Sequence, residues 1–183
     1  RYMKHMEKEE YADQAFADIC YTASTRRTHH DYRLAVVSRS RQDAHDKLEA
    51  FTHGEAGLEV ISGHRVDRRQ KIVWVFPGQG SQWPGMGRDL LEQEPVFCAA
   101  IEECDRMMSK YVAWSLLDQL RANEEQVLKG IDVIQPVLFA IEVALAALWR
   151  SWGIEPDAVV GHSMGEVAAA YVAGALSLDD AAW

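Results

Sequence analysis

Residues 157–166 read Asp-Ala-Val-Val-Gly-His-Ser-Met-Gly-Glu, and this stretch decides the fold of the chain. It contains a G-x-S-x-G pattern, from Gly161 to Gly165, directly after a short apolar run. A strand followed by a sharp turn and a helix is the context in which this pattern forms a nucleophile elbow. The glycines let the backbone turn tightly, so Ser163 is exposed at the tip of the turn. The stretch therefore predicts acyl-serine chemistry.

The same residues also have the spacing of a helix cap. Ser163 and Glu166 fit the S-x-x-E pattern of a capping box. A capping serine needs neither a preceding apolar strand nor glycines on both sides, and both are present here. The context favours the nucleophile, although one serine can fill both roles.

Composition restricts the class of protein. The 183 residues suffice for one large domain or two small ones, and the 48% hydrophobic content is ordinary for a globular protein. The longest apolar stretch, Val137–Trp149, is interrupted by Glu142 and is too short to cross a bilayer. No secretion signal opens the chain, and Cys20, Cys98 and Cys104 form no C-x-x-C pair. We expect a cytoplasmic protein with no membrane span and no metal site.

Charge is distributed unevenly along the chain. Residues 1–70 carry 12 basic and 12 acidic side chains, whereas residues 71–183 carry 7 basic and 16 acidic ones, which accounts for the net charge of −9. An acidic chain lacks the basic surface that binds phosphates, so a nucleic acid partner is not expected. The change in composition near residue 70 predicts two domains, 1–70 and 71–183.

The first 70 residues have the pattern of a small α+β module. Apolar spacing predicts helices over Glu7–Cys20 and Ser40–Phe51. Alternating or apolar runs predict strands over Tyr32–Ser38 and Leu58–Ile61.

Residues 71–183 have a different pattern. The continuous apolar run Ile72–Phe76 predicts a strand that is buried on both faces. A helix follows over Pro95–Lys110, and its expected inward positions are Phe97, Ile101, Cys104 and Met108. Two shorter helical pieces are expected at 114–120 and 124–129.

The C-terminal third completes the pattern of the second domain. Pro136 is placed as the first residue of a helix that runs to Trp152 and stops at Gly153. The strand Ala158–Val160, the elbow and a helix to Ala173 come next, and Ser177 is expected to cap one more helix. The order indicates an α/β fold with a parallel sheet.

A glycine-rich loop follows the first strand of the second domain. Backbone N–H groups of Gly78-Gln79-Gly80 can form an anion-binding nest that supplies an oxyanion donor. A phosphate loop is the competing interpretation, but Trp83 occupies the third glycine position of G-x-G-x-x-G. A plain turn is the third possibility.

The general base is not evident from the residues. His162 directly precedes Ser163, and neighbours at an elbow project in different directions, so His162 is poorly placed to accept the serine proton. No histidine follows Ser163, where a hydrolase would carry its base. The remaining candidates lie in the first domain, where structural roles are expected: His29, His30, His45, His53 and His64.

Three motifs together resemble a known family. Val75–Gln82, Gln135–Ala140 and Gly161–Glu166, in this order and spacing, are similar to the acyltransferase domain of type I polyketide synthases. Arg26–His30 and the following Tyr32–Val37 resemble the linker between the ketosynthase and that acyltransferase. The resemblance covers nearly the whole chain.

The resemblance implies a fold and a reaction. It indicates a linker module followed by part of an α/β-hydrolase-like core of the malonyl-CoA:acyl-carrier-protein transacylase family. Ser163 is then the nucleophile, and Gln79 and Met164 supply oxyanion N–H groups. The residues implied as pocket or supporting groups are His162, Gln135, Gly78 and Gly80. The implied partners are an acyl-CoA extender unit, the phosphopantetheine of an acyl carrier protein and the adjacent ketosynthase. No cofactor is expected to be bound by the chain itself.

The resemblance also places two family residues beyond Trp183. These are the arginine that pairs with the malonyl carboxylate and the catalytic histidine, so we expect a partial domain with little activity of its own. Met164 does not decide between malonyl and branched extender units. Two alternatives stay open: a serine thioesterase or esterase, and a non-catalytic module that organises neighbouring domains.

Overall fold

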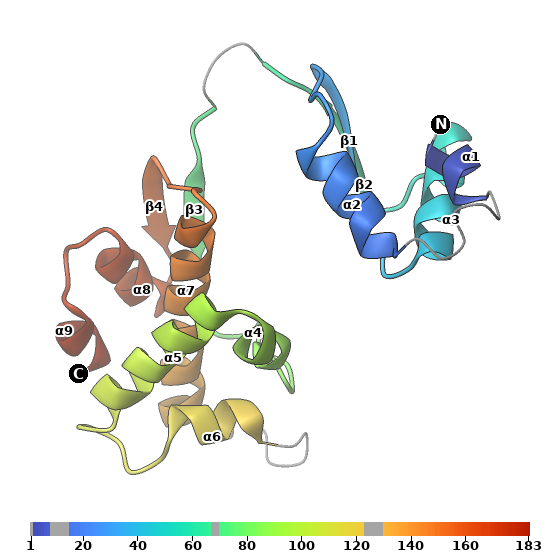
Figure 1. Cartoon of the computed structure of the whole chain (residues 1–183). Coiled ribbons are helices and arrows are strands. Elements are labelled where there is room, and N and C mark those ends of the chain that lie inside the picture. Colours follow the sequence, from blue (N-terminus) through green and yellow to red (C-terminus); the bar gives the residue numbers. More distant parts are fainter. Residues whose placement is uncertain (1, 8–14, 67–69, 123–129) are drawn as a thin grey trace. The chain divides into compact units, whose positions relative to one another are not determined.

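The computed structural model describes residues 2–7, 15–66, 70–122 and 130–183. The chain divides into two compact units, Arg1–Gln70 and Lys71–Trp183 (Figure 1). Each unit has its own hydrophobic core, so the two are described separately.

The first unit combines helices with one antiparallel strand pair. Its elements are α1 (Tyr2–Met6), α2 (Phe16–Thr25), β1 (Tyr32–Val36), α3 (Arg41–Thr52) and β2 (Val60–His64). Strands β1 and β2 pair from Tyr32 opposite His64 to Val36 opposite Val60. The core is small and consists of Met6, Ile19 and Ala44 with Phe16 and Leu48 packed against them.

Several boundaries in this unit differ from the sequence prediction. The strand predicted over Tyr32–Ser38 ends at Val36. The helix predicted over Glu7–Cys20 was placed too early, because Ala15 is extended and α2 continues to Thr25. Residues 8–14 of that prediction lie outside the described residues. The second strand starts and ends later than Leu58–Ile61, because its ends are set by pairing with β1. Helix α3 begins as expected, since the Ser40 side chain accepts a hydrogen bond from the Asp43 N–H at 3.1 Å.

The second unit is a mixed α/β structure. Its elements are β3 (Val73–Phe76), α4 (Arg88–Gln93), α5 (Pro95–Met108), α6 (Leu116–Arg121), α7 (Ile131–Ser151), β4 (Ala158–Gly161), α8 (Gly165–Val172) and α9 (Leu178–Ala182). Strands β3 and β4 pair in parallel, as predicted, with Phe76 opposite Gly161. The segment 124–129 of the prediction lies outside the described residues. The Ser177 side chain caps α9 as expected by accepting from the Asp180 N–H at 3.1 Å.

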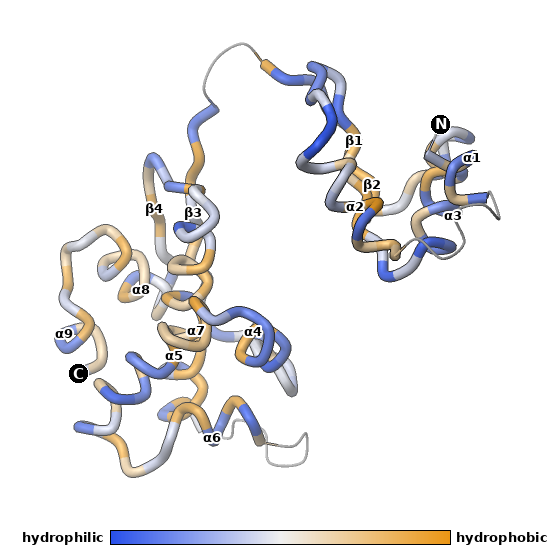
Figure 2. Tube along the Cα trace, viewed as in Figure 1, coloured by the Kyte–Doolittle hydropathy of each residue, from blue (hydrophilic) through white to orange (hydrophobic). Residues whose placement is uncertain are grey.

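Helices α5 and α7 supply most of the core of this unit. All four predicted inward positions of α5 are buried: Phe97, Ile101, Cys104 and Met108. Their spacing of three or four residues places them on one side of the helix, against α7. Helix α7 is apolar along most of its length (Figure 2). The amphipathic pattern of α5 therefore identified its buried face correctly.

The start of α7 corrects the role predicted for Pro136. The helix begins at Ile131, after Gly130 with φ 95°, and Pro136 lies inside it. A proline there removes one intrahelical hydrogen bond, and the packing of α7 in the core offsets this loss. With 21 residues the helix is also long enough to cross a membrane, contrary to the prediction, but it is mostly buried inside the unit. Gly153, at φ 79°, ends it as predicted.

The prediction that β3 is buried on both faces was wrong. Phe76 is buried in the core and the partly buried Trp74 packs against it, whereas Val73 and Val75 are 54% and 68% exposed. The exposure of successive side chains alternates along β3 because, within the described residues, helices cover only the face that carries Trp74 and Phe76. A continuously apolar strand is typical of sheets that are covered on both faces.

Glu142 on α7 is the one charged residue in the described core. Its exposed fraction is 9%, and its Oε2 atom has no hydrogen-bond partner among the described residues. Burial raises the pKa of the Glu142 carboxyl from 4.5 to about 7, since the charged form loses its hydration. This residue therefore destabilises the unit when it is ionised.

We predict that Phe97→Ala destabilises the second unit by about 3–5 kcal/mol, because Phe97 has no exposed surface and the substitution leaves a cavity. Urea unfolding of the 183-residue chain measures this loss. The matched control is Val96→Ala on the same helix, where the side chain is 40% exposed and the cost should be well under that of Phe97→Ala. Equal losses for the two variants would contradict the assigned core.

We also predict that Glu142→Gln stabilises the chain more at about pH 8 than at about pH 5, by at least about 1 kcal/mol. The pKa of Glu142 is higher in the folded than in the unfolded chain, so the folded state binds more protons between these pKa values. Wild-type stability therefore falls as the pH rises through this window, and the amide variant lacks that loss. Unfolding in urea at both pH values tests the difference, and a pH-independent effect would refute it.

Candidate functional site

The turn between β4 and α8 has the geometry of a nucleophile elbow. Strand β4 ends at Gly161 and α8 begins at Gly165, so three residues reverse the chain. Ser163 has φ 55°, and it is the only non-glycine residue with positive φ in the described part of the chain. Such a conformation costs free energy and is found preferentially at functional sites.

The two glycines of the motif allow the close contacts of this turn. A Cβ atom on Gly161 would overlap the backbone of Glu166, and one on Gly165 would overlap the carbonyl oxygens of Phe76 and Pro77. Helix α8 therefore starts directly against the end of β3. The parallel pairing of β3 with β4 therefore requires glycine at both positions of the motif, since a side chain at either one would overlap neighbouring backbone atoms.

Ser163 does not act as a helix cap. The cap position of α8 is Met164, with no side-chain hydrogen bond, and the turn is closed by backbone bonds instead. The Gly165 N–H donates to the His162 carbonyl, and the Glu166 N–H donates to the Ser163 carbonyl, both at 3.0 Å. The capping-box interpretation is therefore wrong, and the Ser163 hydroxyl is not used by the helix.

The glycine-rich loop after β3 lies against the elbow. A Cβ atom on Gly78 would lie 3.1 Å from Ser163 Cβ and 3.4 Å from His162 Nδ1. The Gln135 Nε2 on α7 donates to Gln79 Oε1 at 3.4 Å. The structure thus brings residues from three distant stretches of sequence, near positions 78, 135 and 163, to one place.

The glycine-rich loop and the elbow each contain one backbone N–H group without an acceptor in the described part of the chain. Within the described ranges, the N–H groups of Gln79 and Met164 donate no hydrogen bond. The Gly80 N–H, by contrast, donates to Gln82 Oε1 at 2.7 Å. Met164 precedes α8, whose N-terminus carries partial positive charge. The turn at Ser163 therefore lies at the positive end of α8.

His162 contacts the end of β3 and the glycine-rich loop. Its backbone N–H donates to the Phe76 carbonyl at 3.0 Å, and its ring lies close to Gly78. The histidine therefore connects the elbow to the end of β3. The five candidate histidines of the first domain all belong to the other unit, for which no position relative to Ser163 is defined.

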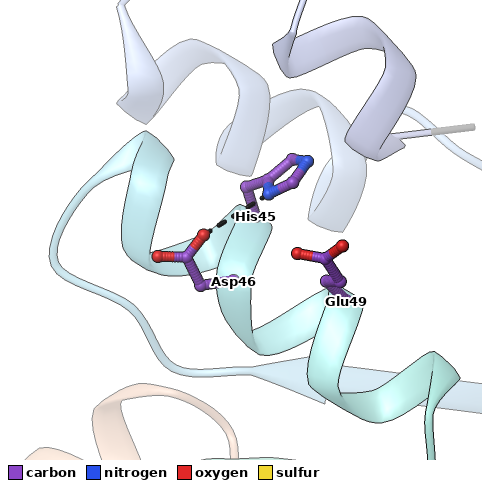
Figure 3. A group of neighbouring side chains, drawn as sticks. All are labelled: His45, Asp46 and Glu49. Atoms are coloured by element: carbon purple, nitrogen blue, oxygen red, sulfur yellow. Dashed lines mark hydrogen bonds and ion pairs between the residues drawn. The ribbon is translucent and has the colours of Figure 1, made fainter.

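One group of possible metal ligands occurs in the described residues, on α3 of the first unit. Ligand atoms of His45, Asp46 and Glu49 lie within 4.8 Å of one another (Figure 3). The His45 ring already bonds to Glu7 Oε1 at 2.8 Å through Nε2 and to Asp46 Oδ1 at 3.5 Å through Nδ1. The hydrogen bond to Glu7 raises the pKa of His45. Because both ring nitrogens are engaged, this group has the chemistry of an ion-pair cluster.

Sequence reasoning missed two residues of interest. Gln82 holds the Gly80 N–H, and it was noted only as part of a motif. Glu142 was noted only because it interrupts an apolar stretch, yet it is buried and lines a groove beside β3. A single carboxylate within an apolar helix was the available signal, because such a residue is rarely buried without a reason.

Two protein families match this chain when it is compared with known proteins. The Acyl transferase domain family matches residues 73–183, and the family described as CurL-like, PKS C-terminal, matches residues 1–48. The first match covers more than half of the chain and includes the elbow and the glycine-rich loop. The chain belongs to the acyl transferase domain family of type I polyketide synthases.

Curated relatives of this acyltransferase chain are much longer proteins. It is 48% identical over 171 residues to polyketide synthase GfsA of Streptomyces halstedii, covering 91% of the chain and 2% of the synthase. It is 47% identical over 175 residues to erythronolide synthase EryA2 of Saccharopolyspora erythraea, covering 94% of the chain and 5% of the synthase. The chain therefore spans a small part of each relative.

Solved acyltransferase domains have the same fold. The acyltransferase domain from module 8 of the salinomycin polyketide synthase superposes with a TM-score of 0.83 at 41% identity, covering 98% of this chain and 42% of that chain. The acyltransferase domain of the polyketide synthase PpsC of Mycobacterium tuberculosis superposes with a TM-score of 0.57 at 51% identity. This match covers 61% of the present chain and 33% of the PpsC domain chain. The chain thus spans less than half of these solved domains.

We predict that Gly165→Ala destabilises the second unit by roughly 2–3 kcal/mol, because the new methyl group collides with backbone atoms at the end of β3. Thermal or urea unfolding measures the effect. Gly57→Ala is the control, since nothing lies within 4 Å of a Cβ atom at Gly57 and its φ is not positive. A tolerated alanine at position 165 would contradict the close packing of α8 on β3.

Proposed function

We propose that residues 71–183 carry the nucleophile of an acyltransferase that moves a malonyl-type extender group from CoA to an acyl carrier protein. The transfer proceeds through an acyl-serine at Ser163, within a longer polyketide synthase. The observation that carries the proposal is the positive φ of Ser163 at an elbow packed against a glycine-rich loop. Membership of the acyl transferase domain family supports it.

In the first half of the reaction, the Ser163 oxygen attacks the carbonyl carbon of the acyl-CoA thioester. The hydroxyl proton passes to a base, and a negative charge develops on the carbonyl oxygen. The N–H groups of Gln79 and Met164 donate to that oxygen, and such donors typically contribute about 3–4 kcal/mol each to the transition state. The C–S bond then breaks, and CoA leaves as the thiol after it regains a proton.

In the second half, the phosphopantetheine thiol of the carrier attacks the acyl-serine ester. The same two N–H groups hold the oxyanion, the C–O bond breaks, and Ser163 regains its proton. We expect the base to be the histidine that the family resemblance places beyond Trp183. His162 is instead a positioning residue, because its ring lies close to the Gly78 loop.

The other proposed pocket residues position the loop. Gln135 donates to Gln79 Oε1 and so connects α7 to the oxyanion loop. Gly78 permits the loop to approach Ser163, and Gly80 turns the chain at φ 125°. We propose that these contacts fix the loop so that the Gln79 N–H donates to the oxyanion, since donors that are positioned in advance are the condition for efficient electrostatic catalysis.

Residues 1–70 are proposed as the module that links this acyltransferase to a neighbouring ketosynthase. The match of residues 1–48 to the CurL-like, PKS C-terminal family supports this assignment. We place the protein in the cytoplasm, in keeping with three free cysteines and with bacterial polyketide synthase relatives. Acyl-CoA and the carrier phosphopantetheine are its proposed substrates.

A chimeric domain provides the test. Residues 1–183 are joined to the remaining part of the salinomycin module 8 acyltransferase domain, which superposes with this chain. The chimera is incubated with malonyl-CoA and, separately, with methylmalonyl-CoA, and intact mass reports the adduct. We predict that Ser163→Ala reduces acylation at least about 10³-fold, because it removes the attacking oxygen.

Ser109→Ala is the matched control, since Ser109 is exposed and follows α5. It should leave acylation unchanged. An adduct that persists in Ser163→Ala would refute the nucleophile assignment. Hydrolysis of the acyl group to water that exceeds transfer to a carrier protein would favour a thioesterase instead.

A further inference from the structure

A cavity with a mixed polar and apolar lining lies in the first unit, between α1, α2 and the loop that follows α2. We call it the α1–α2 cavity, and its volume of about 590 Å³ is in the range of small-molecule sites. The described residues that line it are Tyr2, His5, Ile19, Thr22, Arg27, Thr28 and His30. All of them belong to the first unit, whereas Ser163 belongs to the second.

The described lining of the α1–α2 cavity is basic. Its polar groups are one guanidinium, two imidazoles, two threonine hydroxyls and one phenol, and no carboxylate occurs among the described lining residues. The guanidinium carries a fixed positive charge, and imidazole N–H and hydroxyl groups donate hydrogen bonds. Ile19, which belongs to the small core of this unit, adds an apolar surface. The lining therefore suits an organic anion better than a cation.

Most of these polar groups are unused by the fold. Among the polar lining residues, the side chains without a hydrogen bond, ion pair or ring contact to any described residue are Tyr2, Thr22, Arg27, Thr28 and His30. By contrast, the hydroxyls of Ser24 and Thr25 at the end of α2 donate to carbonyls of their own helix. Several hydrogen-bonding groups are thus free for one occupant of the cavity.

Neighbouring residues in the loop after α2 divide into structural and unused ones. The Arg26 guanidinium lies over the Tyr21 ring, 5.9 Å from its centroid, whereas Arg27 lines the cavity. The His29 Nε2 bonds to a backbone carbonyl of α2 at 2.7 Å, whereas His30 lines the cavity. One member of each pair therefore stabilises the loop, and the other is free to bind a ligand.

The same loop is fixed by hydrogen bonds within the chain. The Arg26 N–H donates to the Thr22 carbonyl, and the Arg33 Nε donates to the His30 carbonyl, both at 3.0 Å. Carbonyls at the end of a helix repel an anion, but these already accept hydrogen bonds: Cys20, Tyr21, Thr22 and Ser24. A loop that is ordered in advance loses little conformational entropy when a ligand binds.

We propose that the α1–α2 cavity binds the phosphate monoester group of a small organic molecule. Arg27 donates to the phosphate oxygens, because the planar guanidinium matches their geometry. The Thr28 hydroxyl and the His30 imidazole complete the contacts, since a phosphate monoester has three terminal oxygens where a carboxylate has two. The organic part of the ligand lies against Ile19 and the Tyr2 ring. The proposal does not depend on the acylation proposed for the second unit.

Phenyl phosphate is the probe, since it joins a phosphate monoester to one small apolar ring. It is titrated into the 183-residue chain, and the amide NMR signals of Thr22 and Thr28 report binding, with phenol as the uncharged control. We expect saturable shifts with a Kd of about 1 mM or tighter for phenyl phosphate and none for phenol. Absence of saturable shifts, or equal shifts with phenol, would overturn the proposal.

Adjacent arginines provide a matched pair of variants. Arg27→Gln should weaken phenyl phosphate binding at least about tenfold, because it removes the charged donor of the cavity. Arg26→Gln removes the same charge from the neighbouring residue, which stacks on Tyr21, and should change the Kd less than about twofold. Equal weakening by both would indicate general attraction to positive charge and would overturn the site.

A second variant and a stability measurement support this comparison. Thr28→Val keeps the charge and removes one hydroxyl, so it should weaken binding by about threefold or more. Arg27 and Thr28 are exposed, and both variants should keep the urea midpoint of the wild-type chain. Unchanged affinity in both folded variants would overturn the proposal.

Competition identifies the source of the phosphate group, which occurs in free organic phosphates and as the 3′-phosphate of coenzyme A. Coenzyme A and 3′-dephospho-coenzyme A are added separately to the complex with phenyl phosphate. Displacement by coenzyme A alone would support the site and assign it to the 3′-phosphate, and displacement by neither would support a free organic phosphate. Equal displacement by both would overturn recognition of a phosphate monoester.

Discussion

The contact between the ends of two parallel strands is the constraint on which the second unit depends. Phe76 lies opposite Gly161, and each strand is followed by a turn that must fit beside the other. Gly165 lets α8 begin against the Phe76 carbonyl, and Gly78 lets the loop approach Ser163. A side chain at either glycine would force these turns apart. The proposed catalytic geometry is therefore a consequence of close backbone packing.

This packing also explains why Ser163 tolerates a strained conformation. Its positive φ is held by backbone hydrogen bonds on both sides, from Gly165 to His162 and from Glu166 to Ser163. The His162 N–H adds a bond to the end of β3. Strain of this kind persists only where the surroundings over-determine the conformation. The Ser163 hydroxyl therefore takes no part in capping α8.

The α5–α7 core supports the site, and the same helix supplies the groove. Helix α7 packs one side against α5, and its Gln135 donates a hydrogen bond to Gln79 in the glycine-rich loop. A further stripe of the helix faces β3. Glu142 belongs to that stripe, so its burial cost is carried by the α5–α7 packing.

The sequence by itself determined those features that depend on local pattern. The 3.6-residue period identified the buried side of α5, the Ser177 cap followed from side-chain chemistry, and the two-glycine motif predicted the elbow. The three motifs also sufficed to recognise the family. Each of these signals lies within a few residues, where backbone sterics and helix periodicity act.

Only the tertiary structure decided features that depend on distant partners. The ends of β2 follow from its pairing with β1, the exposure of Val73 and Val75 follows from what covers the sheet, and the start of α7 before Pro136 follows from core packing. The tertiary structure also decided that the Ser163 hydroxyl does not cap α8, because backbone hydrogen bonds close the turn instead. Burial and pairing are set by residues far away in the chain, and for that reason no local pattern could reveal them.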